Sequence, residues 1–491
     1  MVKAFCLSLA ALVAVGCSVT NNLDTVKQSA NDLIAPKAPD RELALNTRLD
    51  SFSTLPDSST YLLNLNAKTS TWEKTIAEKA SSSTGEFIEY LFGSIGESDS
   101  YEPRPFEISL LSTYLAMNHH LAGFPDLAAV EARKIIEREA LIEQLMQKQT
   151  AVIEKQKEYD SGLGPEANVV TEIEYINGYP IKTIQSPEVT AIKSSYLNPF
   201  STIVAGFTFE ANGEPSLAVP AYRRALEINP SLSFVKGRIA NLNRVSKRKS
   251  VVLFVIESGD IDRITEDKFN YETYTLLGYR SSGIKLPVLD KSASRALPRI
   301  WVNDQQLTSQ ATIDISAYLA KAIAEELPKY LAFATTKALI EIASQESLKR
   351  TLRPARQFDY GISQLAGSYA LKKIFDRGGL DLSQWKALPS NIAYGIVELE
   401  RNMPYQIRVN NGGETTSLTI VPTKDYFVVN FRVGSNTISN KALASSDQRF
   451  TQYKDRIINA AAQRPQTTIG QLKCLTNMIS TGIINADCSS K

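Results

Sequence analysis

The stretch FSTIVAGFTFEANGEPSLAVPAYRRALEINPS, residues 200–231, constrains the fold more than any other part of this 491-residue chain. Its apolar residues follow a helical spacing on both sides of a turn that contains glycine, which predicts two antiparallel helices. Small residues let the helices approach closely, aromatic residues fill the space beside them, and a proline ends the second helix. These positions are Gly206, Phe209, Gly213, Ala218, Tyr222, Ala225 and Pro230.

This spacing matches the tetratricopeptide repeat, a helix pair that stacks on further copies of itself. The large aromatic residue expected near the start is missing, and Thr202 stands in its place. A second copy is predicted in SLLSTYLAMNHHLAGFPDLAAVEARKII, where Gly123 and Ala128 take the places of Gly213 and Ala218. Such repeats cannot bury their faces alone, so a stack or a cap is expected.

The sequence contains two histidines, which are adjacent. His119 takes the position of Phe209 in the second copy, and that is a packing position. A ligand or base formed by His119 and His120 is the alternative, but we favour packing. Neither these residues nor the cysteines have the spacing of a metal site, and no metal or cofactor is predicted.

A long insertion follows the second copy, at about 126–190. Its first part predicts one long helix with a stripe of apolar residues at heptad-like separations. The stripe could contact a partner helix, but we favour packing on the rest of this chain. Its members are Ile135, Ile142, Leu145 and Val152.

The second part of the insertion contains Asn177-Gly178 between alternating apolar residues. This pattern predicts a β-hairpin with a type I′ turn. A hairpin that projects from a helical scaffold would be a natural contact point, so Tyr175 and Tyr179 are candidate partner-binding residues.

The N-terminus predicts export. Residues 1–16 carry one cationic residue and then an apolar run too short to span a bilayer, as expected of a signal peptide. The run ends in AVGC, which resembles the bacterial lipobox, although Ala14 stands where leucine is commonest. The resemblance implies acylation of Cys17, palmitate included, and Ser18 after it implies the outer membrane. A plain signal peptide with an incidental cysteine is the alternative.

Residues 17–42 predict a flexible tether after the anchor, because they are polar and contain two nearby prolines. Two further cysteines, Cys474 and Cys488, lie near the C-terminus. In an oxidising periplasm they would form a disulfide, with a pair of free thiols as the alternative.

The two halves of the chain together predict the α+β class: a helical, tetratricopeptide-like domain over 43–246, an α+β domain over 250–433 and a tail over 434–491. In the second half, VVLFVIESGD predicts a buried strand, and the last four strands predict an antiparallel meander. The predicted elements are strands at 251–257 and 299–303, helices at 313–347 and 354–376, and four strands in IAYGIVELE, YQIRVNN, SLTIVP and YFVVNFRV.

A search for catalytic motifs finds no Walker loop, no GxSxG elbow and no GxGxxG after a strand. Glu325 and Glu326 are adjacent on a predicted helix, so they face different ways and are poorly placed to act as one acid–base pair. The formal net charge of +2 gives no electrostatic case for nucleic-acid binding. An enzyme is therefore not the expectation.

The order of these parts resembles a family of uncharacterised bacterial tetratricopeptide-repeat lipoproteins. The similarity covers most of residues 100–435, and its most specific piece is the cluster of Trp385, Leu388 and Pro389 in DLSQWKALPSNIAYGIVELERNMPYQIRV. The resemblance implies envelope work, because members are often encoded near lipoprotein activators of penicillin-binding proteins. It supplies no catalytic residues.

The expected function is a non-catalytic protein–protein interaction scaffold in the bacterial cell envelope, linked to peptidoglycan synthesis or envelope assembly. Its expected partners are the lipid bilayer, through Cys17, and an envelope protein or peptide that the periplasm-facing body binds. Trp385 at the domain seam is a candidate contact, with a core position as the alternative. The alternatives for the function are a carboxylate-based peptidoglycan- or carbohydrate-processing enzyme and a fixed structural subunit of an envelope complex.

Overall fold

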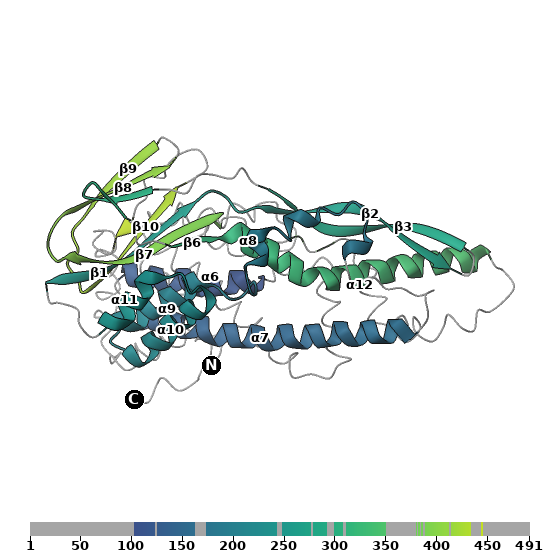
Figure 1. Ribbon diagram of the computed structural model, residues 1–491, viewed down its shortest axis with the longest axis horizontal. Helices are drawn as coiled ribbons and strands as arrows, with labels where there is room; N and C mark the ends of the chain where they lie inside the picture. Colours follow the sequence, from purple (N-terminus) through teal and green to yellow (C-terminus); the bar gives the residue numbers. More distant parts are fainter. Residues whose placement is uncertain are drawn as a thin grey trace, which may run out of the picture.

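The computed structural model shows an elongated molecule, with a layered core at one end and a long arm at the other (Figure 1). It describes residues 103–122, 125–162, 173–242, 248–275, 278–291, 299–307, 311–349, 380, 382, 384–385, 388–411, 414–433 and 443–444. The predicted signal peptide, Cys17, the tether, the helix at 354–376, Cys474 and Cys488 lie outside the described residues.

The core is built around β1 (Lys249–Ser258), whose apolar run VVLFVI is buried throughout. A strand is apolar on both faces when both faces of its sheet are covered. β1 is the central strand of a five-stranded sheet in the order β11-β10-β1-β7-β6. Its partners are β6 (Ala311–Asp314), β7 (Asn391–Glu400), β10 (Tyr426–Val433) and β11 (Leu443–Ala444).

A four-stranded sheet in the order β5-β4-β8-β9 covers one face of the five-stranded sheet. Phe254 of β1 and Phe427 of β10 share a buried cluster with Ile407 of β8, so the two sheets form a sandwich. The strands of this second sheet are β4 (Arg299–Val302), β5 (Gln305–Gln306), β8 (Tyr405–Asn411) and β9 (Glu414–Ile420).

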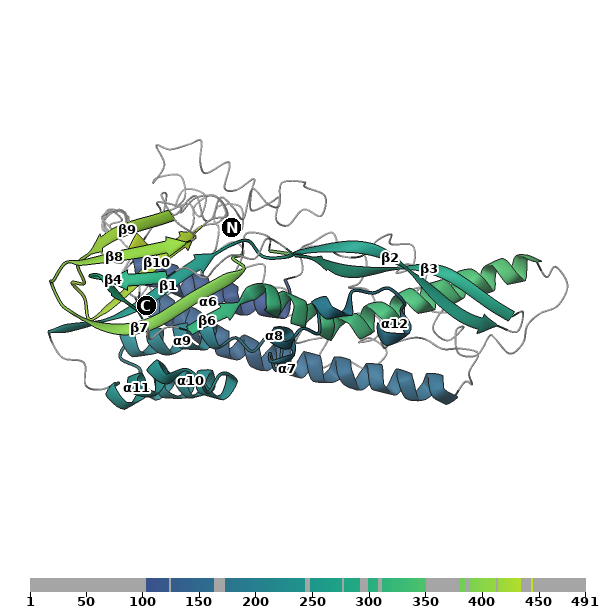
Figure 2. The same cartoon turned by 45° about the horizontal axis from the view of Figure 1, so that its top comes forward.

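Helices cover the other face of the five-stranded sheet (Figures 1 and 2). Phe200 and Tyr222 from the helices share one hydrophobic cluster with Leu253 and Tyr394 from the sheet. The helices and the sandwich therefore bury a common core. The helices of this layer are α6 (Pro105–Ala122), α9 (Pro199–Ala211), α10 (Pro215–Ile228) and α11 (Ser233–Asn241).

The arm consists of two long helices and a two-stranded ribbon, which leave the core in the same direction (Figures 1 and 2). The ribbon lies along the second of these helices, and its apolar face, with Phe269 and Ile284, belongs to the same cluster as the helix residue Leu331. The elements are α7 (Pro125–Gly162), α12 (Ile315–Lys349), β2 (Arg263–Thr275) and β3 (Gly278–Asp290).

Several sequence predictions are confirmed at the level of single elements. β1, β4 and α12 lie where strands and a helix are expected, and α7 is the predicted long helix. Ile135 and Ile142 of its apolar stripe are about 1% exposed and pack inside this chain. The mixed α+β class is therefore established.

The predicted antiparallel meander is wrong. β7 and β10 lie in the five-stranded sheet on either side of β1, whereas β8 and β9 belong to the other sheet. β10 runs parallel to β1, with Val251 opposite Tyr426. Two residues assigned to the tail, Leu443 and Ala444, pair with β10 as well. The alternation of apolar and polar residues fixes which face of a strand is buried, but it does not fix which strand lies next to it. Here β1 lies between β7 and β10.

The predicted hairpin around Asn177-Gly178 is also wrong in the residues that the structure describes. Two short 3₁₀ helices, η2 (Ile173–Tyr175) and η3 (Ile181–Thr183), flank the turn and are followed by α8 (Pro187–Thr190). Ile173, Ile176 and Tyr179 are buried at intervals of three residues, which is a 3₁₀ spacing and not an alternation.

Candidate functional site: a buried polar junction between helices and sheet

The predicted helix pair is α9 and α10, and its small and aromatic residues lie where the two helices meet. A Cβ atom added to Gly206 would lie 2.6 Å from Cδ1 of Tyr222, so the glycine allows the ring to pack directly on the backbone of α9. The predicted packing residues Gly206, Phe209, Ala218, Tyr222 and Ala225 are all buried. Pro230 follows two residues after the end of α10.

The turn between these helices uses Gly213 as the sequence predicts. Gly213 has φ +72°, a left-handed conformation that glycine adopts without a steric penalty. Its N–H donates to the carbonyl of Glu210 at 3.0 Å, and the N–H of Glu214 donates to the carbonyl of Phe209 at 2.8 Å. This pair of bonds is a Schellman motif, which ends α9 and sets the angle at which α10 begins.

Four side chains meet where this helix pair contacts the sheet, and we call them the Glu210 cluster: Glu210, Tyr222 and Arg238, which are buried, and Tyr426, which is half-buried. Arg238 holds the Glu210 carboxylate with two nitrogens, Nε at 3.0 Å and an Nη at 2.5 Å. The hydroxyl of Tyr222 donates to Oε2 at 2.9 Å, and the hydroxyl of Tyr426 donates to Oε1 at 3.1 Å.

The Glu210 cluster joins α9, α10 and α11 to β10. A second carboxylate extends it to β7, because the other Nη of Arg238 donates to Glu398 at 2.8 Å. Burial raises the pKa of Glu210, while the Arg238 charge and the hydrogen bonds oppose that rise. Since both oxygens of Glu210 accept hydrogen bonds, the carboxylate serves to hold elements together and is not a free base.

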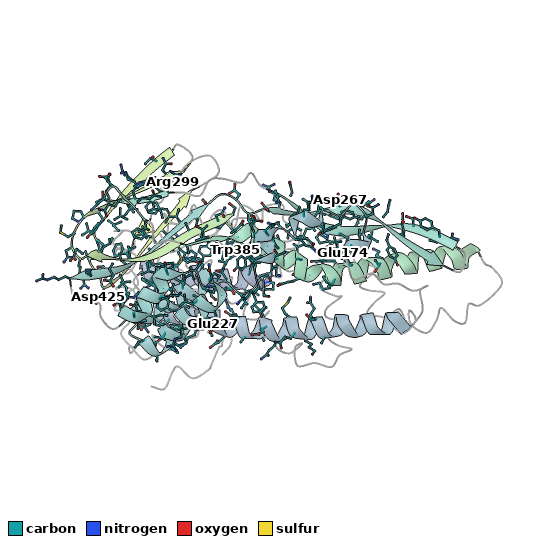
Figure 3. The ribbon with its side chains drawn as sticks, viewed as in Figure 1. Glu174, Glu227, Asp267, Arg299, Trp385 and Asp425 are labelled. Atoms are coloured by element: carbon teal, nitrogen blue, oxygen red, sulfur yellow. The ribbon has the colours of Figure 1, made fainter. Side chains whose placement is uncertain are left out.

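A second polar contact fixes Trp385, the sequence candidate at the seam (Figure 3). Trp385 is 3% exposed, its backbone N–H donates to Oε1 of Glu107 at 2.8 Å, and its ring meets that of Tyr114 edge to face with centroids 5.8 Å apart. Glu107 is itself buried in α6. Trp385 is therefore a core residue that ties its segment to α6, as the alternative interpretation holds.

The candidate contact Tyr179 also points inward. It is 7% exposed, its hydroxyl donates to the carbonyl of Pro287 at 2.9 Å, and its ring lies 5.3 Å from that of Phe269. Tyr179 therefore joins the segment between η2 and η3 to the ribbon, and it offers no surface to a partner. Tyr175 lies in η2, and its side chain is outside the described part of the chain.

Both histidines lie in α6, where His119 is buried and His120 is half-buried. His119 is 6% exposed, and the ring of His120 meets that of Phe207 edge to face at 5.5 Å. Burial lowers the pKa of His119 to about 4, with a further contribution from Lys134. Burial lowers the pKa of His120 to about 4 as well, with contributions from His119 and Lys424. Both rings are therefore neutral near pH 7, in agreement with packing positions.

These histidines predict a pH-dependent stability. Their pKa in the unfolded chain is near 6.5, so between pH 6.5 and 4 the unfolded state binds protons that the folded state does not. The stabilisation is complete above pH 6.5 and is lost as the pH falls towards 4. Between pH 7 and pH 5, the parent should lose about 2 kcal/mol more of its free energy of unfolding than His119→Leu does. Urea unfolding at the two pH values measures this difference, and parallel losses in both proteins would contradict it.

The adjacent carboxylates Glu325 and Glu326 take different partners on α12. Glu325 accepts hydrogen bonds from the hydroxyls of Ser194 and Ser195, at 3.0 and 2.6 Å. Glu326 lies 3.8 Å from the guanidinium of Arg104 and accepts from the hydroxyl of Tyr330 at 3.2 Å. The two carboxylates therefore act in separate contacts.

Two further observations concern the described part of the chain. Within it, no group of three or more His, Cys, Asp or Glu side chains is arranged to hold a metal ion. Of the helices in the described ranges, none is long and apolar enough to span a bilayer.

Sequence reasoning missed Glu210, Arg238, Glu398 and Tyr426. A signal for one of them is present, because Glu210 ends the apolar run IVAGFTF and a charge there requires a buried partner. Its partners come from separate elements, so the tertiary structure was needed to find them.

Comparisons with known proteins do not add to this picture. A scan against models of protein families found no match, and searches of curated proteins and of solved structures also found none. What the protein does must therefore be inferred from its own residues.

Proposed function

We propose that this protein is a lipid-anchored, non-catalytic scaffold that binds another protein or a peptide in the bacterial cell envelope. The helix pair α9–α10 is proposed to be a tetratricopeptide-type unit, with α6–α7 as a second copy. The packing of Gly206 on Tyr222 and the turn at Gly213 support this assignment. The proposed link to peptidoglycan synthesis or envelope assembly rests on the family resemblance.

The proposed binding role rests on the structure of the arm. β2 and β3 pair residue for residue from Arg263–Asp290 to Thr275–Gly278, and their apolar face rests against α12. A ribbon supported in this way keeps its shape, which a binding surface needs. Figure 3 shows Asp267 on this ribbon, far from Asp425 at the core end of the molecule.

The outer face of the ribbon is polar and exposed. Lys268, Asn270 and Glu272 alternate along β2 on one face, opposite Lys285, Gly283 and Ser281 of β3. Tyr279, near the end of the ribbon, is 48% exposed, and tyrosine is enriched where proteins bind one another. We infer that this face and Tyr279 contact the partner.

Site-directed photo-crosslinking tests the binding role. A photoreactive phenylalanine analogue at Asn270 or Glu272 should give a reproducible adduct with one envelope component in intact cells. The matched control is the same analogue at Met403, which is 55% exposed between β7 and β8 on the core. Adducts at Met403 alone, or none at the ribbon, would count against the arm as the binding surface.

Lipid anchoring makes a separate prediction. Cys17→Ser should move the protein from the membrane fraction to the soluble fraction after cell lysis, because the acyl chains that contribute about 0.8 kcal/mol per buried CH₂ would be missing. Cys488→Ser is the matched control and should stay with the membranes. Fractionation followed by immunoblotting measures both. A Cys17→Ser protein that still sediments with membranes would refute the anchor and would leave the crosslinking result unaffected.

A further inference from the structure

Strand β9 is an edge that differs from the other sheet edges in the described part of the chain. Natural proteins protect edges by keeping them short or by placing charges or proline on them. β5 and β11 have two residues each, and β6 has four. The ribbon carries Asp267, Lys268, Lys285 and Pro287. β9 has seven residues, ETTSLTI, with one charge at its first position and no proline.

The register of β9 on β8 shows which backbone groups point outwards. Asn411 pairs with Glu414 across two connecting residues, and the closing pair of such a hairpin exchanges both of its hydrogen bonds. The outward groups then belong to every second residue: Thr415, Ser417 and Thr419. Asn410 donates through its side chain to Oγ1 of Thr415 at 3.0 Å, as expected where opposite side chains are closest and the backbones do not bond.

These three residues also expose their side chains. The edge therefore presents a hydroxyl-bearing row together with N–H and C=O groups that β8 does not use. An edge of this length, without a charge in its centre, can pair with another strand.

We propose that β9 is a dimer interface, in which two copies of this chain pair β9 with β9 in antiparallel register about a two-fold axis at Ser417. Thr415 then lies opposite Thr419 of the partner subunit, and Ser417 lies opposite Ser417 of the partner subunit. The two four-stranded sheets join into one, and the outward groups form about six backbone hydrogen bonds.

The sequence of β9 fits this arrangement better than pairing with an unrelated strand. Antiparallel pairing of a strand with itself places hydroxyl opposite hydroxyl at all three outward positions, and the Thr–Thr pairs on either side of the central Ser–Ser pair are favourable across strands. The register also places Glu414 opposite Ile420 of the partner subunit, so the one charged residue of β9 does not meet its own copy.

Two double variants that differ only in the sign of the charge at position 415 test the proposal and its register. In Thr415→Lys/Thr419→Lys, lysine opposes lysine twice in the dimer, which should raise its dissociation constant about tenfold or more. In Thr415→Glu/Thr419→Lys, glutamate opposes lysine twice, and the dissociation constant should stay within about threefold of the parent. Sedimentation equilibrium of the full-length chain in density-matched detergent measures the dissociation constants of the parent and of both double variants.

Proline gives an independent test at the centre of the edge. Ser417→Pro removes an N–H that β8 does not use, so the monomer should keep its melting temperature, as edge strands tolerate proline at such positions. Dimerisation should be lost. Ser417→Thr keeps the N–H and should dimerise like the parent.

Several results would overturn the proposal. A parent chain that remains monomeric at every concentration, or that binds an added extended peptide at β9 instead of a second copy, excludes the dimer. Equal dissociation constants for the two double variants exclude the antiparallel register. A Ser417→Pro variant that keeps its melting temperature and still dimerises moves the interface away from β9.

Discussion

Replacing Arg238 with methionine is expected to lower the free energy of unfolding by about 3–5 kcal/mol, because it leaves the buried Glu210 carboxylate without its ionic partner. The hydroxyls of Tyr222 and Tyr426 would remain as donors, but neither carries a charge. Glu398 would also lose its short contact with Arg238. Chemical denaturation at pH 7 measures the loss.

The pH dependence separates a charge effect from a packing effect. Arg238 opposes the rise in the pKa of Glu210 that burial causes, so the pKa rises further in the variant. A folded-state pKa above the unfolded value means that the folded state gains stability as the pH falls. The deficit of Arg238→Met should therefore be smaller at pH 5 than at pH 8. A deficit that does not change with pH would indicate lost packing alone.

Lys249→Met is the matched control for this prediction. Its Nζ lies 3.8 Å from Glu398 and its side chain is 41% exposed, so removing the charge should change the stability by less than about 1 kcal/mol. Adding Glu210→Gln to Arg238→Met should recover part of the loss, because glutamine is neutral and its side-chain oxygen can still accept from a tyrosine hydroxyl. Equal losses for the Lys249 and Arg238 variants would contradict the role of the Glu210 cluster.

The second large effect is expected at Gly206. A Cβ at this position would lie 2.6 and 2.7 Å from two ring carbons of Tyr222, so Gly206→Ala forces α9 and α10 apart or displaces the ring. Displacing the ring also removes its hydroxyl from Glu210. Overpacking of this kind costs about 1–3 kcal/mol, which outweighs the gain of up to about 1 kcal/mol from replacing glycine in a helix.

Gly237→Ala is the control, with the opposite sign expected. Gly237 lies inside α11, and a Cβ there would meet no atom within 4 Å, so alanine should stabilise the protein by about 0.5–1 kcal/mol. Thermal or urea unfolding of both variants measures the contrast. In a Tyr222→Leu background the penalty of Gly206→Ala should shrink, and an unchanged penalty would show that the ring is not the cause.

Local features of this fold could be predicted from the sequence because their causes lie within a few residues of one another. Gly206, Gly213 and Tyr222 occupy the positions that their spacing requires, and the run VVLFVI is a strand buried on both faces. His119 fills a buried packing position, as its alignment with Phe209 predicts.

The ribbon β2–β3 could not be predicted in this way. Its strands are thirteen residues each and largely polar on one face, and Pro287 interrupts the pattern of β3. Proline is compatible with a strand whose outer edge is unpaired, but the sequence does not show which strands are edges. The support of the ribbon by α12 and Tyr179 comes from segments far away in the chain.

The sequence by itself determined several elements of the layers: that α7, α9, α10 and α12 are helices, that β1 is a strand buried on both faces, and which residues bring α9 and α10 into contact. Only the tertiary structure decided which strands are neighbours. β10 lies parallel to β1, β8 and β9 lie in the other sheet, and Glu210 meets Arg238 and Tyr426 from two other elements. The physical reason is that side-chain periodicity encodes burial, a local property, whereas strand partners and buried ion pairs depend on how distant segments pack.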